Sequence, residues 1–417
     1  MLNLRFQNIR FVIPTYKRYD VKTLELLKSH SVDIKQIYLF VADNIEYEIY
    51  KNKYPEYKII IGILGLANQR NFICNYFRED DFIVSMDDDL TKFNSYLLTE
   101  TQIALKHNTL QYMILNGFKR CIELKAFIFG VSQTDNEYFM KNSITVDFTF
   151  IIGHFFGFIN RKCDDLKIEC DQKEDYERCI KYFIKDKIMI KFNNYSFKTN
   201  TYTNKGGMQT NPNRILDSDA RAKILLEQYK DYISLKTCKS KYIELRLNKV
   251  KSNYKVVNTL DTINKNNQIV LHLLKLLNNT NLLINSKRTS VGKGITQTFG
   301  KSHIRRKKGI HDCKNNFKYP ELFLSLIELI KFIKPDFTYT TIQLNKNFKS
   351  NPHIDLNNKG EGLIIGLGDY EGGKTTINGL QYDIKYKPTI FNASKWIHSN
   401  ELPITGDRYS ICYFTLI

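Results

Sequence analysis

Short apolar runs alternate with polar stretches over the first ninety residues of the chain. Apolar runs cover residues 10–14, 36–42, 58–63 and 81–86, and a stretch near residues 22–30 has helical periodicity. Strands that alternate with helices predict an α/β fold with a parallel sheet wrapped by helices. Ligands of such sheets bind at the carboxyl ends of the strands. The polar residues that follow each apolar run are therefore the first candidates for a site.

Helical periodicity dominates the middle of the chain. Residues 173–183 form an amphipathic pattern that opens with Glu174 and Asp175. Residues 211–285 are rich in Lys and Asn, and helical periodicity returns at residues 220–232 and 268–277. We expect residues 211–285 to be a helical connector, part of which packs on the sheet that follows.

The last part of the chain has the pattern of short strands broken by glycine turns. Residues 362–367 form an apolar run that leads into a glycine-rich turn ending at Gly373, and residues 389–392 form a further strand pattern. Such spacing predicts an α+β domain built on a double-stranded β-helix, or jelly roll, whose inward face holds a small ligand cavity.

Two histidines and one carboxylate accompany these strands in a spacing that suits a metal. Side chains two apart on a strand point the same way, so His353 and Asp355 can grip one ion together, and His398 comes from a distant strand. Two imidazoles and one carboxylate occupy one face of an octahedral metal and leave three positions open, as non-haem iron(II) oxygenases require. A coincidence among the 8 His of the chain is the alternative.

Arg408 and Ser410 follow His398 on one face of the next strand. A fixed guanidinium binds a carboxylate with two parallel hydrogen bonds, which fits the far carboxylate of 2-oxoglutarate.

Residues 351–373, His398 and residues 408–410 resemble the iron- and 2-oxoglutarate-dependent dioxygenases, and the His-x-Asp-x-x-Asn-x-Gly form looks closest to the TET/JBP-like nucleic-acid base hydroxylases. The resemblance implies O2 as co-substrate. It also implies that iron(II) is bound by His353, Asp355 and His398, and 2-oxoglutarate by Arg408 and Ser410. Protein prolyl hydroxylases share the metal triad, so the narrower assignment stays open.

Three consecutive carboxylates, Asp87, Asp88 and Asp89, directly follow the fourth apolar run. They would repel one another unless a cation or solvent lies between them. Mg²⁺ or Mn²⁺ bridged to a diphosphate meets that need and neutralises a leaving nucleoside diphosphate. A solvated turn or helix cap is the alternative.

Residues 13–18, Asp43, residues 65–71 and residues 87–89 together resemble a GT-A (Rossmann-like) glycosyltransferase. The resemblance implies a nucleotide-sugar donor, with UDP-glucose as the first choice. It places the donor against Pro14, Thr15, Asp43 and Arg70, and the Mg²⁺ or Mn²⁺ on Asp87 and Asp89. Asp43 could equally be an ordinary strand-end carboxylate, and Arg70 a helix residue paired at the surface.

An inverting transferase needs a base that takes the proton of the acceptor hydroxyl. Glu174 and Asp175 at a helix entry resemble the acceptor-site acid of GT-A enzymes, with Asp175 the first choice and Glu174 the second. Helix capping is the alternative, because the helix dipole stabilises acids at this end. The two blocks in one chain resemble the TET/JBP-associated glycosyltransferases.

Length and cysteine usage agree with a multidomain intracellular protein. A chain of 417 residues predicts two to three domains. We expect a glycosyltransferase domain at 1–210, the connector at 211–285 and a dioxygenase domain at 286–417. No signal peptide opens the sequence, and the 8 Cys lack paired spacing. We therefore expect a cytoplasmic or nuclear protein that is not secreted or membrane-bound, with a large DNA virus as a candidate source.

The net charge of +19 is concentrated in residues 287–308, where no acid occurs. Glycines at 292, 294, 300 and 309 predict a loop that follows a phosphate backbone, with Arg305, Arg306, Lys307 and Lys308 as nucleic-acid contacts. A solvated surface is the alternative.

These features together predict a bifunctional enzyme that hydroxylates a pyrimidine methyl group in DNA and glycosylates the product. The base must be single-stranded or flipped out of the duplex. No obligate protein partner is evident. A hydroxylase-glycosyltransferase of lysyl or prolyl side chains is the main rival, and a nucleic-acid-binding scaffold with degenerate sites is the non-enzymatic one.

Overall fold

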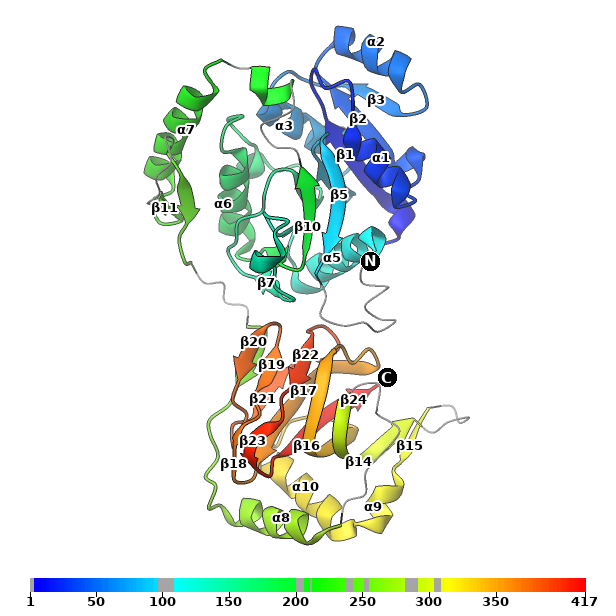
Figure 1. Ribbon diagram of the computed structural model, residues 1–417, viewed down its shortest axis with the longest axis vertical. Helices are drawn as coiled ribbons and strands as arrows, with labels where there is room; N and C mark the ends of the chain where they lie inside the picture. Colours follow the sequence, from blue (N-terminus) through cyan, green and yellow to red (C-terminus); the bar gives the residue numbers. More distant parts are fainter. Residues whose placement is uncertain are drawn as a thin grey trace. The chain divides into compact units, whose positions relative to one another are not determined.

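The protein divides into two compact units, Met1–Tyr254 and Lys255–Ile417 (Figure 1). The computed structural model describes residues 4–96, 109–199, 206–210, 212–236, 243–250, 255–281, 292–303 and 309–417. The segment 211–285 is divided between the units. Helix α7 (Arg214–Gln228) belongs to the first unit, and helix α8 (Gln268–Asn279) belongs to the second.

A mixed eight-stranded sheet forms the centre of the first unit. In spatial order its strands are β3 (Lys58–Ile61), β2 (Ile37–Val41), β1 (Ile9–Pro14), β4 (Phe82–Met86), β8 (Phe155–Ile159), β6 (Ile128–Val131), β9 (Ile190–Phe192) and β7 (Ile144–Val146). The first four strands are parallel, and β8 is antiparallel to both of its neighbours. The predicted parallel sheet is thus present over the first ninety residues, and an inverted strand adjoins it.

Helices cover both faces of this sheet, which explains why β4 and β8 are apolar and buried along their whole length. Helices α3 (Leu66–Tyr76) and α6 (Glu174–Asp186) share one apolar core with Phe156 and Phe158 of β8. Helix α5 (Leu110–Leu124) packs Phe118 against Phe82 and Phe129. Helices α1 (Lys22–Ser29) and α2 (Asn44–Lys53) also belong to the sheet region.

The predicted polar clusters collect at one edge of the sheet. β1 ends at Pro14, β2 at Val41 and β4 at Met86, and the three strands are parallel. Thr15, Asp43 and Asp87 therefore follow strand ends at the same edge, as the alternation of strands and helices predicted.

Two small sheets complete the first unit. β5 (Leu90–Ser95) pairs with β10 (Tyr195–Thr199), and β11 (Ile233–Leu235) pairs with β12 (Leu245–Leu247). α7, β11 and β12 pack on Ile180 of α6 through a small apolar cluster.

A ten-stranded sheet forms the second unit, and all its strand pairs are antiparallel. Its main path is β13 (Val257–Thr259), β21 (Thr389–Phe391), β17 (Asn358–Leu367), β24 (Tyr409–Leu416), β16 (Thr341–His353), β22 (His398–Asn400), β19 (Thr375–Ile377) and β20 (Leu380–Tyr382). β14 (Gly292–His303) branches from β16 and carries β15 (Ile310–Asp312). β18 (Tyr370–Gly372) pairs separately with β23 (Pro403–Gly406).

Helices α8 and α10 (Pro320–Ile333) cover one face of this sheet (Figure 1). Tyr409, Ile411 and Tyr413 of β24 belong to the core beneath these helices. The side chains that alternate with them face the other side. A short helix, α9 (Lys314–Lys318), precedes α10. None of the described helices is long and apolar enough to cross a membrane.

The prediction of a loop at residues 287–308 was wrong at residues 292–303, because these residues form strand β14 along β16. Glycine lets the backbones of β14 and β16 pack closely here. Gly300 has a φ of +73°, and a Cβ atom there would lie 2.5 Å from the carbonyl oxygen of Thr340. The predicted nucleic-acid contacts lie outside the described residues: Arg305, Arg306, Lys307 and Lys308.

Candidate active sites

Two histidines stand opposite each other where β16 meets β22. β16 ends at His353 and β22 begins at His398, and the antiparallel register pairs these two residues directly. Their ring centroids are 4.3 Å apart. The backbone N–H of Asp355 donates to the carbonyl oxygen of Ala393, 3.0 Å away, which holds this residue beside the pair. Strand register thus brings together residues that are far apart in the sequence.

Backbone hydrogen bonds orient both imidazoles. Nδ1 of His353 donates to the carbonyl oxygen of Asn351 at 2.7 Å, and Nδ1 of His398 to that of Trp396 at 3.1 Å. Because a carbonyl only accepts, each Nδ1 carries a proton in these contacts, and Nε2 is the ring nitrogen that can bind a metal. The Nε2 atoms of His353 and His398 lie 3.6 and 3.7 Å from the carboxylate oxygens of Asp355.

This donor set fits a divalent transition metal. One ligand atom from each of His353, Asp355 and His398 lies within 4.8 Å of the others. Nδ2 of Asn358 donates to the Asp355 carboxylate at 3.2 Å and so fixes its orientation. In the described part of the chain only the two histidines lie within ion-pair distance of Asp355. Two imidazole nitrogens and one carboxylate suit iron(II) and leave coordination positions open.

A cavity opens beside the triad. The side chains of His353 and Asp355 are 19% and 30% exposed, so a ligand can reach them. The lining combines amides and hydroxyls with aromatic rings: Gln343, Asn345, Ser350 and Asn400, with Phe348, Phe391, Tyr413 and Phe414. Polar groups on an apolar wall are typical of a site that binds and orients a small molecule.

Arg408 is fully buried and has no acidic partner within ion-pair distance among the described residues. It donates to the carbonyl oxygens of Gly373 and Phe348, and its Nε–H has no hydrogen-bond partner in the described residues. Burial lowers its pKa. Ser410 shares a face of β24 with Cys412, which lines the cavity, and Arg408 directly precedes this strand. A buried guanidinium without a counter-ion favours an anionic ligand at this place.

The three aspartates after β4 have different surroundings. Asp88 accepts from Thr15 Oγ1 at 2.7 Å and from Arg18 Nη1 at 2.6 Å, and Arg18 also reaches Asp89 at 3.3 Å. The Asp88 and Asp89 side chains are buried, whereas that of Asp87 is 38% exposed. Burial raises the pKa of Asp88 to about 6, although Arg18 opposes this shift. Asp87 is the carboxylate most open to a ligand.

The predicted donor-binding residues lie along the same edge. Thr15 also contacts the Tyr50 hydroxyl at 2.8 Å, and it directly follows Pro14 at the end of β1. Asp43 accepts the backbone N–H of Glu46 at 2.9 Å and caps helix α2. The carboxylate of Asp43 thus has a structural role at the start of α2, and its contact with a donor stays a prediction.

Arg70 is buried rather than paired at the surface. It donates to Ser85 Oγ at 2.8 Å and to the carbonyl oxygen of Gly153 at 3.0 Å. Its Nη2 also lies 3.2 Å from Glu174 Oε1 and 3.6 Å from Asp87 Oδ1. Both ends of its guanidinium are therefore occupied by protein groups.

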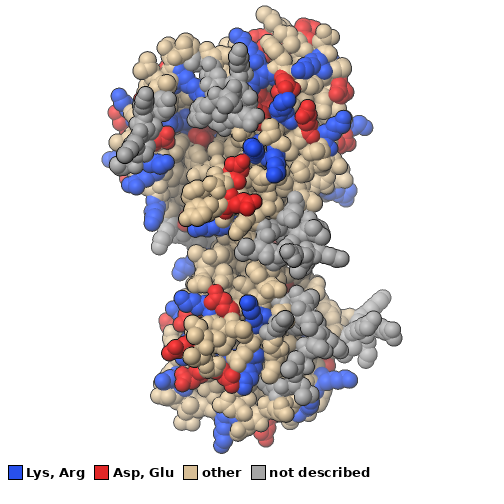
Figure 2. All heavy atoms as spheres, viewed as in Figure 1, with Lys and Arg blue, Asp and Glu red and all other residues tan. Residues whose placement is uncertain are grey.

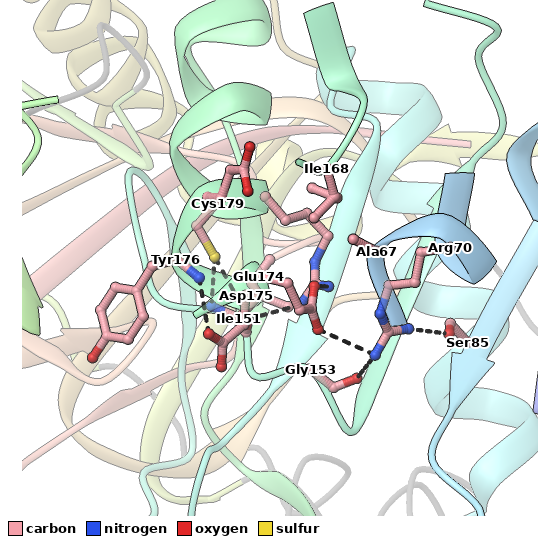
Figure 3. Close-up of polar contacts among 12 residues, drawn as sticks. Ala67, Arg70, Ser85, Ile151, Gly153, Ile168, Glu174, Asp175, Tyr176 and Cys179 are labelled. Atoms are coloured by element: carbon pink, nitrogen blue, oxygen red, sulfur yellow. Dashed lines mark hydrogen bonds and ion pairs between the residues drawn. The ribbon is translucent and has the colours of Figure 1, made fainter. Parts of the chain in front are cut away.

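Glu174 and Asp175 open helix α6 with different partners, which Figure 3 shows. Glu174 is buried and paired with Arg70 and Arg178. Asp175 is partly exposed, and no ion pair in the described part of the chain involves it. Burial and the charge of Glu174 raise the pKa of Asp175 to about 6. A carboxylate with such a pKa is suited to accept a proton near neutral pH.

The sequence did not single out several residues that shape this site. Arg178 lies one helical turn after Glu174, and this spacing could have predicted their ion pair. Arg18 meets Asp88 across seventy positions of sequence, and no local pattern predicts such a contact. His154 precedes β8, and its Nε2 is buried without a hydrogen-bond partner among the described residues. Burial lowers the pKa of His154 to about 4, so its imidazole is neutral.

Comparisons with known structures find weak similarities to oxygenases. The chain is 12% identical to NgTET1 in complex with 5mC DNA, with 39% of this chain and 72% of that chain covered and a TM-score of 0.29. An oxidoreductase of the 2OG-Fe(II) oxygenase family from Burkholderia pseudomallei is 13% identical, with coverages of 38% and 84% and a TM-score of 0.29. The viral collagen prolyl hydroxylase of Paramecium Bursaria Chlorella virus-1 is 12% identical, with coverages of 38% and 95% and a TM-score of 0.25. These values are too low to add to what the residues of this chain establish.

A family comparison finds a similarity over most of the first unit. No curated protein matches the chain significantly. Residues 9–207 match the profile of the TET-Associated Glycosyltransferase family. This segment contains the sheet edge with Asp87, Arg70 and Asp175, and the match supports the resemblance predicted from the sequence motifs. The first unit is therefore similar to the TET-associated glycosyltransferases.

Proposed function

We propose that the chain is a bifunctional enzyme that hydroxylates the methyl group of a pyrimidine base in DNA and then transfers a sugar to the new hydroxyl. The second unit carries the iron(II)- and 2-oxoglutarate-dependent hydroxylase on a jelly-roll fold, and the first unit carries a GT-A-type glycosyltransferase. The convergence of His353, Asp355 and His398 carries the proposal. The family match over residues 9–207 supports the transferase half.

In the hydroxylase, His353 and His398 bind iron(II) through Nε2, and Asp355 binds it through its carboxylate. Arg408 and Ser410 hold the far carboxylate of 2-oxoglutarate. The buried guanidinium without a counter-ion supports this assignment. When bound, iron(II) and 2-oxoglutarate supply the activation of O2 that converts a methyl C–H bond into C–OH. The amides and aromatic rings of the cavity orient the substrate and limit the access of water.

In the transferase, Asp175 accepts the proton of the hydroxymethyl group as the hydroxyl oxygen attacks the anomeric carbon of the donor. The bond from that carbon to the nucleoside diphosphate breaks, and the diphosphate leaves with the bonding electrons. Asp87 and Asp89 would hold a Mg²⁺ or Mn²⁺ ion, which would stabilise the negative charge of the leaving diphosphate. Pro14 and Thr15 lie beside the nucleoside of the donor, for which UDP-glucose is the first choice.

The order of the two reactions follows from their chemistry. A methyl group offers no oxygen nucleophile, whereas a hydroxymethyl group does. Hydroxylation must therefore precede transfer. Neither site admits a base that is stacked inside a duplex, so the target is single-stranded or flipped. The net charge of +19 supports a polyanionic substrate.

The proposal is tested with purified chain, iron(II), 2-oxoglutarate and oligonucleotides that contain either 5-methylcytosine or thymine. Nucleoside mass spectrometry should show a gain of one oxygen, and a further gain of one hexose when UDP-glucose is added. The Asp355→Ala variant is the negative control. Oxidation of lysyl or prolyl peptides, with no change in either oligonucleotide, would move the protein-directed alternative into first place.

A further inference from the structure

Glu174 lies between Arg70 and Arg178 at the first turn of α6, and Figure 3 shows its contact with Arg70. Its Oε2 atom accepts from Nη1 of Arg178, one helical turn later, and its Oε1 atom lies 3.2 Å from Nη2 of Arg70 on helix α3. The side chains of all three residues are less than a tenth exposed. Each carboxylate oxygen of Glu174 therefore has its own cationic partner, and neither is open to a substrate.

Arg70 and Arg178, which together with Glu174 form the bridge Arg70–Glu174–Arg178, also bind the backbone that faces helix α6. Nη2 of Arg178 donates to the carbonyl oxygen of Ile151 at 3.3 Å, and Nη2 of Arg70 donates to that of Gly153 at 3.0 Å. A Cβ atom at Gly153 would lie 2.7 Å from Glu174 Oε1. Glycine is thus needed for the carboxylate to approach this loop. The loop continues into β8, whose neighbour β4 ends at the aspartates.

Arg70 connects Glu174 with strand β4 and with Asp87. Its Nη1 donates to Ser85 Oγ of β4 at 2.8 Å, and its Nη2 lies 3.6 Å from Asp87 Oδ1. One guanidinium therefore touches the carboxylate proposed for the donor metal and the residue next to the proposed base. Asp175 itself stays outside the bridge.

We propose that Glu174 is a positioning residue rather than the base, and that the bridge Arg70–Glu174–Arg178 fixes Asp175 relative to Asp87. This inference rests on the proposed glycosyltransferase, and it assigns Arg70 to the same bridge instead of to direct contact with the donor. Asp175 and the acceptor hydroxyl must meet the anomeric carbon in one geometry, and a displacement of about 1 Å can cost about a hundredfold in rate.

The bridge also acts on Asp175 through its charge. Loss of the Glu174 charge removes a repulsion that opposes ionisation of Asp175, and it releases Arg178 to attract that carboxylate. Both effects favour the ionised form. A neutral residue at 174 should therefore shift the protonation of Asp175 to lower pH, which a purely structural role of Glu174 would not do.

The first experiment compares the pH dependence of sugar transfer for the full-length wild type, Glu174→Gln and Glu177→Gln. Glu177 is a matched control, because it lies on the same helix, is fully buried and bridges Lys181 at 2.9 Å and Arg221 at 2.8 Å. For Glu174→Gln we expect the acid limb of the rate profile to move down by about one pH unit and the plateau to fall ten- to a hundredfold. Glu177→Gln should leave the acid limb in place.

Two further variants separate the effect of the Glu174 charge from the effect of its side-chain length. Glu174→Asp keeps the charge but is too short to reach both arginines, so the plateau should fall while the acid limb stays near its wild-type position. Asp175→Asn should lose nearly all transfer. The inference is overturned if Glu174→Gln loses transfer as completely as Asp175→Asn does, or if its acid limb does not move.

A second measurement does not need sugar transfer. The folded-state pKa of Asp175 is raised, so its ionisation destabilises the fold as pH rises from its ordinary value through about 6. The gain in melting temperature from Asp175→Asn should therefore grow between pH 4 and pH 7, and it should grow less when Glu174→Gln is also present. Equal growth in both backgrounds contradicts the inference. The wild-type chain could transfer no sugar while the gain in melting temperature still differs between the two backgrounds as expected. The proposed function would then be wrong, and the coupling of Glu174 to Asp175 would be retained.

Discussion

The two carboxylate-containing clusters of this protein differ in what balances their charge. Asp355 has two imidazoles beside it and no Lys or Arg within ion-pair distance in the described part of the chain. Asp88 and Asp89, in contrast, are paired with Arg18, and Asp87 lies near Arg70. A bound metal ion would balance the charge of the first cluster, whereas protein cations already compensate much of the negative charge of the second cluster.

This difference explains why one metal site is evident from the structure and the other is not. One ligand atom from each of His353, Asp355 and His398 lies within 4.8 Å of the others. In the first unit the described residues form no such three-ligand cluster. A Mg²⁺ or Mn²⁺ ion there must take its further ligands from the diphosphate of the donor. We therefore expect iron to bind the free protein and Mg²⁺ or Mn²⁺ to bind together with the nucleotide sugar.

The largest effect is expected from loss of the iron site. Asp355→Ala or His353→Ala should reduce iron binding and base oxidation by about a thousandfold or more, because the metal loses a ligand and the oxygen chemistry depends on it. Metal analysis of the purified protein and nucleoside mass spectrometry measure this loss. Transfer of sugar to supplied hydroxymethyl-DNA should persist. If either change removed both activities in a folded protein, the two sites could not be separate.

Loss of the donor metal site should lower sugar transfer and leave base oxidation intact. The double change Asp87→Ala, Asp89→Ala should lower sugar transfer about a hundredfold or more, because the leaving diphosphate loses its metal. Hydroxymethylated base should then accumulate as the end product. Transfer at a rate close to that of the wild type would leave these aspartates as a turn held by Arg18 and Arg70.

The sequence predicted the elements of the site better than its contacts. Buried strands and their polar ends could be predicted because runs of apolar residues and strand-end aspartates are local signals. The metal triad could be predicted because its chemistry restricts the residue types and spacing. The contact of Arg18 with Asp88 joins distant segments, and only the packed fold reveals it. Arg70 was predicted to bind the donor, and its contacts with Ser85, Gly153 and Glu174 depend equally on the packed fold.

The error at residues 292–303 has a similar cause. Glycines and lysines in this segment are typical of a loop, yet β16 offers it an unpaired strand edge, and glycine lets the two backbones approach closely. Tertiary pairing therefore outweighed local preference. The division of residues 211–285 between two units also depends on packing, because α7 packs near α6 and α8 packs with α10.

A moderate effect of pH should distinguish the two activities further. Because the pKa of Asp175 is raised to about 6, the base becomes protonated as pH falls through that value. Sugar transfer should then decline about tenfold for each pH unit below 6, as expected for a single ionisable base. Steady-state transfer rates between pH 4.5 and 8 measure this decline. A rate that stays constant down to pH 5 would exclude Asp175 as the base.

The smallest effect is expected from the basic run before β15. Neutralising Arg305, Arg306, Lys307 and Lys308 should weaken DNA binding for every sequence and reduce the salt dependence by about one unit of slope per lost phosphate contact. Oxidation of a free nucleoside should hardly change, because the iron ligands and Arg408 are untouched. Binding isotherms at several salt concentrations give the slope. Unchanged affinity and slope would favour a protein substrate.

The central claim is that two separate sites act in sequence on the same base, and nucleoside mass spectrometry of DNA from cells that express the chain tests it most directly. Wild type should yield a hexosylated hydroxymethyl pyrimidine, Asp175→Asn only the hydroxymethyl pyrimidine, and Asp355→Ala neither product. Unmodified DNA in cells that contain folded, iron-loaded wild-type protein would contradict the claim.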